Sequence, residues 1–255
     1  MHTSHQPRSY GLRGRARLLI ATATVLAITG CGNATPDTSS AIGREEFADR
    51  VISAALKANT LQMRIDSGGD SIRADIVLND ESDMLASDLS MSTRQPLLVR
   101  WKNGRIYIKD KSLAKGWVAA DPTDPRDPVG AQFGYVRTLN PVTLVKDARD
   151  IAIALTRVGT EVVDGTNTTH YSMTLDPELA TSGSTINAEG LRAQGHQGKL
   201  VYEFWIDEND LMVEVTFDVA DRTDRVHMSE WGMPKDVEAP IAARTTAELG
   251  MLESS

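Results

Sequence analysis

The segment from Leu61 to Ile76 decides the fold class, and it reads LQMRIDSGGDSIRADI. On both sides of a glycine pair, apolar residues occupy every second position and polar residues stand between them. A period of two places apolar side chains on one face of a β-strand, and the sequence SGGD at 67–70 predicts a tight turn. The segment therefore predicts an antiparallel hairpin with one apolar face. Its apolar positions are Leu61, Met63, Ile65, Ile72, Ala74 and Ile76.

The same alternation returns along most of the chain. Asn103-Gly104 is the strongest turn signal, because this pair readily takes the two positive φ angles of a type I′ turn. Because the strands come in hairpins and do not alternate with helices, the sequence predicts an α+β fold with one antiparallel sheet, long enough to curl. Further strands are expected at 84–91, 97–102, 105–109, 117–119, 159–163, 168–175, 200–207, 211–219 and 225–231.

Two segments carry a helical period instead. In residues 44–59, apolar side chains recur at spacings of three and four. Asn140 and Pro141 predict the start of a second helix, as N-cap and first-turn residue, and its apolar face continues to Thr156. Both helices are expected to cover one face of the sheet.

Three segments are expected to be mainly loops. Residues 121–128 hold three Asp/Pro pairs and predict a surface loop, because proline is excluded from helix and strand interiors. Residues 177–198 are rich in Gly, Ser and Ala and predict a loop with one weak helix at 188–194. The tail from Pro234 is expected to be irregular.

The N-terminus predicts export and lipidation. Four arginines precede an apolar run of 11 residues, Leu18–Ile28, whereas a membrane-spanning helix needs about 20. Residues 1–30 are therefore predicted to be a signal peptide. Ile28-Thr29-Gly30-Cys31 resembles the bacterial lipobox, so Cys31 is expected to carry diacylglycerol and palmitate. The alternative is a buried cysteine behind an ordinary signal peptide.

The expected domain organisation follows from this N-terminus. Residues 31–43 would form the lipidated cysteine and a flexible tether, and residues 44–255 a single domain. The predicted location is the extracytoplasmic face of the cell membrane, with the lipid as anchor. Residues 31–255 hold 23 Lys and Arg against 35 Asp and Glu, a formal charge of −12. This acidic balance argues against nucleic acid as a partner.

Motifs for catalysis or metal binding are missing from the sequence. There is no GxSxG motif, and the single cysteine is assigned to lipidation. His170, His196 and His227 lack the spacing of metal ligands, and Asp207 and Glu208 fall at a predicted turn. We therefore expect a protein that is not an enzyme and has no metal or cofactor.

Four segments carry a resemblance to a known family: GRIY at 104–107, KGWV at 115–118, VDGTNTTHY at 163–171 and FWIDE at 204–208. In this order they resemble the LppX/LprA/LprF/LprG group of actinobacterial lipoproteins, whose fold is that of the LolA/LolB carriers. The resemblance implies a half-barrel sheet closed by helices around an apolar cavity. It also implies binding of lipid or glycolipid acyl chains, as carrier or sensor, and an envelope transporter as a possible partner.

Apolar residues of the strands and of the second helix are the candidate cavity lining, since flexible aliphatic and Met side chains accommodate varied acyl chains. The alternative is a solid core in a lipoprotein that binds other proteins, as an accessory subunit or signalling regulator. The candidates are Met63, Ile65, Ile76, Leu89, Met91, Val99, Leu144, Ala148, Ile151, Met173, Leu175, Phe204, Ile206, Val213 and Val215.

Overall fold

The computed structural model describes residues 42–78, 84–92, 97–110, 116–134, 136, 139–181, 184–186 and 188–251. The predicted signal peptide, Cys31 and nearly all of the tether lie outside these residues. None of the helices in the described ranges has both the length and the apolar character that a bilayer crossing requires.

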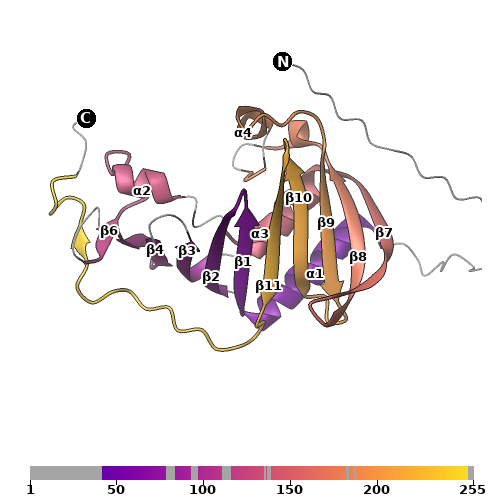
Figure 1. Cartoon of the computed structure of the whole chain (residues 1–255), viewed down its shortest axis with the longest axis horizontal. Helices are drawn as coiled ribbons and strands as arrows, with labels where there is room; N and C mark the ends of the chain where they lie inside the picture. Colours follow the sequence, from indigo (N-terminus) through magenta and orange to yellow (C-terminus); the bar gives the residue numbers. More distant parts are fainter. Residues whose placement is uncertain are drawn as a thin grey trace, which may run out of the picture. The chain divides into compact units, whose positions relative to one another are not determined.

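Twelve strands in the described residues form one sheet, in the order β12-β6-β5-β4-β3-β2-β1-β11-β10-β9-β8-β7 (Figure 1). All neighbouring strands are antiparallel except β12 and β6, which are parallel. The α+β architecture with one large, mainly antiparallel sheet is confirmed. The strands are β1 Thr60–Ser67, β2 Asp70–Leu78, β3 Met84–Ser92, β4 Leu97–Lys102, β5 Arg105–Lys109, β6 Val118–Ala120, β7 Ala152–Val163, β8 Thr166–Leu175, β9 Leu200–Asp207, β10 Met212–Val219, β11 Arg222–Ser229 and β12 Arg244–Thr245.

Two of the predicted turns have the expected geometry. Gly68 and Gly69 have φ of 57° and 92°, and Asn103 and Gly104 have φ of 53° and 74°. Two consecutive positive φ values define a type I′ turn, whose twist matches that of the flanking strands. These turns fix the register of the β1–β2 and β4–β5 hairpins, and with it the face on which each apolar side chain lies.

Helices α1 and α3 contact each other and pack their buried residues into the core that the sheet residues share. The predicted N-cap of α3 is present, since Asn140 Oδ1 accepts a hydrogen bond of 2.9 Å from the amide of Val142. The C-terminal end of α1 is marked by Asn59, which has a φ of 66°. The helical elements are α1 Arg44–Ala58, α2 Pro128–Phe133, α3 Pro141–Ile151, the 3₁₀ helix η2 Pro177–Leu179 and α4 Ala188–Ala193.

The predicted end of the second helix at Thr156 is wrong. Helix α3 ends at Ile151, and strand β7 begins at the next residue, Ala152, seven residues before the predicted strand start. β7 pairs with β8 from its first residue, Ala152 opposite Leu175. The apolar spacing also fits a helix, but the sequence from Ile151 to Val158 is rich in β-branched residues that suit a strand. Pairing with β8 makes residues 152–158 a strand instead of a continuation of the helix.

The tail after β11 is mainly irregular, as expected, but it contacts β2 and β4 and includes a short strand, β12, that pairs with β6. Lys235 lies near its start, with Nζ 3.0 Å from Asp75 on β2 and in contact with Glu230. Burial lowers the pKa of Lys235, and these two carboxylates outweigh burial, so the pKa is raised overall. Further on, Arg100 on β4 donates to the carbonyl of Glu238. We call residues 233–246 the C-terminal strap.

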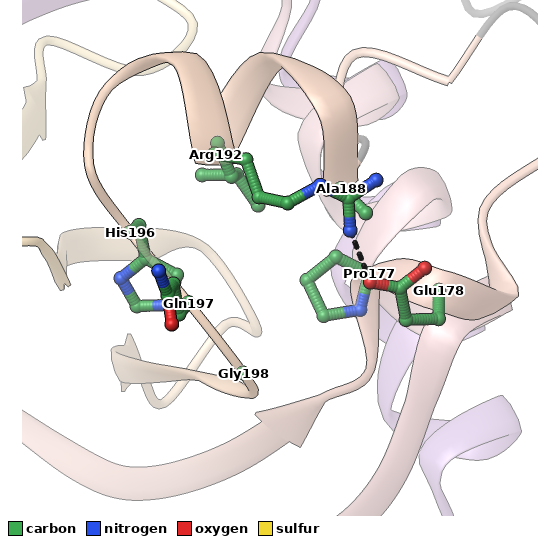
Figure 2. A pocket seen from close by; sticks show the side chains of 8 residues that line it. Pro177, Glu178, Ala188, Arg192, His196, Gln197 and Gly198 are labelled. Carbon is green, nitrogen blue, oxygen red and sulfur yellow. Dashed lines mark hydrogen bonds and ion pairs between the residues drawn. The ribbon is translucent and has the colours of Figure 1, made fainter.

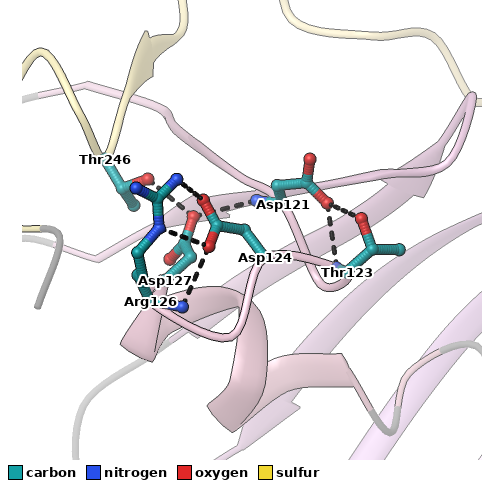
Figure 3. Close-up of polar contacts among 6 residues, drawn as sticks. All are labelled: Asp121, Thr123, Asp124, Arg126, Asp127 and Thr246. Carbon is teal, nitrogen blue, oxygen red and sulfur yellow. Dashed lines mark hydrogen bonds and ion pairs between the residues drawn. The ribbon is translucent and has the colours of Figure 1, made fainter. Parts of the chain in front are cut away.

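The strap ends on a polar network around Asp127, which is drawn in Figure 3. Asp127 caps α2 by accepting from the amides of Val129 and Gly130, at 3.1 and 2.9 Å. Its second oxygen accepts from the amide of Asp121 at 2.9 Å and from the hydroxyl of Thr246 at 2.6 Å. The Asp/Pro loop predicted at 121–128 is therefore a fixed turn that joins α2 to the strap.

Candidate functional site

An apolar layer fills the space between the sheet and helices α1 and α3. Phe47 on α1 belongs to it, with its ring centroid 5.1 Å from that of Tyr171 on β8 and 5.4 Å from that of Phe204 on β9. Strand alternation produces the layer, because every second residue of β9, from Leu200 to Ile206, is buried. The same period turns the residues between them to the outer face of the sheet.

The structure brings most of the predicted lining residues into this core. Val213 is buried but does not join it, because it lies at an irregularity in the β9–β10 register. Ile65 and Leu144 are partly buried and pack against the core, and the side chain of Met91 lies outside the described part. The predicted residues in the core are Met63, Ile76, Leu89, Val99, Ala148, Ile151, Met173, Leu175, Phe204, Ile206 and Val215.

Many of these side chains have no accessible surface. Ile76, Met173 and Phe204 are each 0% exposed. A side chain beside a void of water size would keep some accessible area, so protein atoms surround these three residues on all sides. The layer is packed around these three residues, and its role as a lipid cavity stays a prediction.

Several core residues were not among the candidates. Tyr202 and Leu61 continue the period-two pattern of their strands, so the alternation could have identified them. Phe47 and Val51 lie on the predicted apolar face of the first helix and could have been found in the same way. Met212 follows a turn, and only the strand pairing places it in the core.

A polar cluster lies on the outer face of the sheet. His170 on β8 has one ring nitrogen 3.0 Å from Glu161 on β7 and the other 2.8 Å from Glu203 on β9. Its ring stacks on Trp205 at a centroid distance of 4.5 Å, and the indole N–H donates to Glu161 at 2.6 Å. Ser172 donates to Glu203 at 2.9 Å. The contacts join three neighbouring strands, which is a structural role.

Glu214 and His227 pair across β10 and β11 on the same face. Burial raises the pKa of the Glu214 carboxyl, and the nearby positive charge of Arg225, 3.6 Å away, opposes this only in part. Asp164 in the β7–β8 turn reaches to 3.5 Å from Nδ1 of His227. The tip of the β7–β8 hairpin therefore lies against the outer face of the sheet.

A pocket of about 370 Å³ lies beneath α4, at the end of the sheet where β8 ends and β9 begins (Figure 2). Helix η2 contributes Pro177 and Glu178, and α4 contributes Leu191 and Arg192. His196 belongs to the turn that follows α4. Arg192 donates to Glu178 at 2.6 Å across the pocket. The full lining is Pro177, Glu178, Ala188, Leu191, Arg192, His196, Gln197 and Gly198.

The three histidines lie apart. His170 is in the polar cluster on the outer face, His196 is in the turn beside the pocket, and His227 is a partly buried residue of β11. Within the described residues, no group of three His, Cys, Asp or Glu side chains has a geometry that could hold a metal ion. Asp207 accepts from the amides of Asn209 and Leu211, both at 2.8 Å, so its carboxylate shapes the β9–β10 turn.

Comparison with solved structures places the fold among known ones. LprF from Mycobacterium bovis is 16% identical to this chain with a TM-score of 0.50, and the match covers 76% of this chain and 96% of that chain. The lipoprotein LppX from Mycobacterium tuberculosis is 16% identical with a TM-score of 0.46, over 77% of this chain and all of that chain. No protein-family model and no curated protein matches the sequence. The predicted resemblance is confirmed at the level of the fold.

Proposed function

From the fold that this chain shares with LprF, we propose that residues 44–255 bind the acyl chain of a lipid or glycolipid between the sheet and helices α1 and α3. A lipid on Cys31 would hold this domain at the extracytoplasmic face of the membrane. The observation that carries the proposal is the continuous apolar layer of aliphatic, Met and aromatic side chains in this shared fold. The partners of the protein decide whether it acts as carrier or sensor. We propose that an envelope transporter is one of them.

An acyl chain that enters beside the packed residues requires the layer to open, and the free energies allow it. Separating α1 from the sheet exposes Phe47, Ala48, Val51 and Ala55, at a cost on the order of 6 kcal/mol. Transfer of an acyl chain of about 16 carbons out of water gains roughly 13 kcal/mol, at about 0.8 kcal/mol per CH₂. An aqueous acyl chain can therefore drive the opening. A chain that comes from a bilayer gains almost nothing from the transfer itself, so the cost of opening must then be offset by the contacts that the chain makes with the separated faces.

The test uses the exported chain with Cys31→Ser, which cannot be lipidated. We expect mass spectrometry of an organic extract to recover a bound lipid, and a fluorescent fatty acid to be taken up with an emission shift typical of apolar surroundings. Recovery of no lipid together with no uptake of the probe would contradict the proposal.

A pair of variants locates the site. Ala148 on α3 is fully buried in the layer, so Ala148→Leu fills space that the acyl chain needs and should reduce probe uptake. Val201 lies on the outer face of β9 and is 43% exposed, so Val201→Leu should leave uptake unchanged. Circular dichroism checks that both variants fold. Equal uptake by the two variants would place the ligand outside the layer.

A second candidate function is binding of another protein by a domain with a solid core. Two observations favour it. Several core side chains, such as Ile76, Met173 and Phe204, are 0% exposed. Among the described strands β7 stands at one edge of the sheet, with Val158 and Val162 exposed at 57% and 64%. This function predicts a stable partner in co-purification from envelope extracts. It also predicts that neither lipid nor probe binds.

A further inference from the structure

We propose that the outer face of the β4–β5 hairpin is a docking surface for a membrane that carries anionic lipids. The proposal rests on the proposed lipid on Cys31 only for the closeness of the membrane, whereas the charge of the surface belongs to the described residues. We call the following residues the basic surface: Arg100, Lys102, Arg105, Lys109 and Trp117.

The charge of this hairpin differs from that of the rest of the chain. Residues 97–109 hold four Lys and Arg and no Asp or Glu, whereas residues 31–255 carry a formal charge of −12. Net charge describes the whole protein, but attraction to a surface depends on the charges within a Debye length of it, about 8 Å at physiological salt. An anionic membrane would therefore attract this hairpin and repel the acidic remainder, which orients the domain.

Strand alternation puts the four cations of the hairpin on the outer face. Residues that alternate with them are each 0% exposed and face the core: Val99, Ile106 and Ile108. On the outer face Lys102 stands directly opposite Arg105, and Arg105 and Lys109 are both exposed. These last two are four residues apart on one strand, about 13 Å at 3.3 Å per residue, so one small anion cannot reach both. The spacing suits a surface with many anionic groups.

These charges are not neutralised within the described residues. Lys102, Arg105 and Lys109 form no ion pair there. The carboxylate of Asp121 lies within electrostatic reach of Arg105, but it accepts hydrogen bonds from Thr123 instead. Like charges directly opposite each other destabilise a strand pair, as Lys102 and Arg105 do here. An anionic surface would relieve this repulsion.

Trp117 places an aromatic ring beside two of the cations. The guanidinium carbon of Arg100 lies 5.3 Å and the ammonium nitrogen of Lys109 5.9 Å from the ring centroid, which is within the range of cation–π contacts. The ring is half-buried. Tryptophan favours the boundary between lipid and water, because its ring is apolar and its N–H is polar. This preference favours a membrane over an acidic protein as the occupant.

The proposed anchor makes weak docking sufficient. Residues 32–43 extend to at most roughly 40 Å, so a lipid on Cys31 would keep the domain near the bilayer. A short flexible linker gives an effective concentration on the order of mM. Docking with a dissociation constant in that range would therefore hold the domain in one orientation and still let it detach.

The experiment uses residues 31–255 with Cys31→Ser, a chain that contains every described residue but neither the predicted signal peptide nor a lipid. Cosedimentation measures its binding to vesicles. We expect binding to vesicles of phosphatidylcholine with phosphatidylglycerol, none to vesicles of phosphatidylcholine alone, and weaker binding as salt is added. Lys102→Gln together with Arg105→Gln should lower the affinity about 30-fold, which is the change that about 1 kcal/mol per basic residue gives.

The matched control is Arg64→Gln together with Arg73→Gln. These arginines also stand opposite each other on the outer face, but Asp66 neutralises Arg64 at 3.0 Å. The net charge changes equally, and the affinity for anionic vesicles should change little. Vesicles with brominated acyl chains should quench the tryptophan emission, and Trp117→Phe should remove most of this quenching. Circular dichroism shows whether each variant folds.

Equal binding to the two kinds of vesicle, or an equal loss of affinity in the two double variants, overturns the docking surface. Binding of polyglutamate without binding to anionic vesicles assigns the basic surface to an acidic protein and overturns the membrane as its occupant. Both kinds of vesicle offer the same acyl chains, so a difference between them does not depend on the apolar layer. Docking can therefore stand when uptake of the acyl probe fails, and it can fail when uptake stands.

Discussion

Replacing Asp127 by Ala should unfold the end of the sheet that carries α2 and the C-terminal strap. The Asp127 side chain is buried and accepts four hydrogen bonds, two of them from the first amides of α2. The other two come from the amide of Asp121 and the hydroxyl of Thr246, which lie on separate segments. One substitution therefore removes the helix cap, the bond to the loop at Asp121 and the link to the strap at Thr246.

The magnitude follows from these contacts. Loss of an N-cap costs about 1 kcal/mol. Each donor left buried without a partner costs about 1–3 kcal/mol, and Asp121 and Thr246 each leave one. We expect Asp127→Ala to lower the free energy of unfolding by about 3–7 kcal/mol, a large part of the 5–15 kcal/mol that is typical of a domain. Thr246→Val removes one of these bonds and should cost about 1 kcal/mol.

Urea denaturation followed by tryptophan fluorescence measures the free energies, and hydrogen exchange measures local protection. In Asp127→Ala we expect faster exchange at the amides of α2 and at Thr246, whose amide donates to the carbonyl of Ala119 on β6. Strands β8 and β9 serve as the internal reference. A loss below about 1 kcal/mol, with unchanged exchange in α2 and the strap, would refute the reasoning.

Three further perturbations test other parts of the structure. A Cβ on Gly130 would lie 2.2 Å from the carbonyl oxygen of Asp121, so Gly130→Ala should destabilise the fold by about 1–3 kcal/mol in urea titrations, while Gly134→Ala, with no contact below 3.9 Å, should not. Phe47→Ala should cost about 3–5 kcal/mol of unfolding free energy, and a loss below about 1 kcal/mol would argue against a packed layer. Because burial raises the pKa of Glu214, the folded state holds its proton more tightly than the unfolded state, and stability falls as the pH rises through that pKa. Glu214→Gln should lack this fall in unfolding titrations at several pH values, and an unchanged pH profile would contradict the assignment.

Local sequence features account for the parts of the fold that were predicted. The hairpins at Gly68-Gly69 and Asn103-Gly104 depend on backbone angles that their own residues favour. Strand β9 has the predicted bounds, because its alternation is regular and turns enclose it. Helix α1 carries its own apolar face, and Asn59 ends it.

Contacts between distant segments decide the remaining parts. The boundary between α3 and β7 depends on β8, which follows in the chain, and the helical period continues past Ile151. β12 is a strand because Arg244 and Thr245 pair with β6, which lies more than a hundred residues earlier. Helix α2 could have been anticipated, since Asp127 and Pro128 form an N-cap and first-turn pair like Asn140 and Pro141.

In the candidate site, too, local patterns predict some features, and contacts between distant segments decide the others. Alternation was enough to identify the side chains that share the inner face, such as Met173 and Phe204. The alternation of apolar and polar residues does not specify how much space the inner side chains leave between them. The sequence therefore could not distinguish a packed layer from a hollow one. The pocket beneath α4 also escaped prediction, because it joins η2 to a turn some twenty residues later, and neither segment has a periodic pattern.

The ladder between β1 and β11 has a consequence for biosynthesis. Met63 pairs with Met228, so one edge of β1 has no native neighbour until nearly the whole polypeptide has been made. Closing this ladder is a late event with a large entropic cost, and it joins two meanders that can each form earlier. A chain truncated before β11 would present the bare edge of β1 to other chains, which favours aggregation.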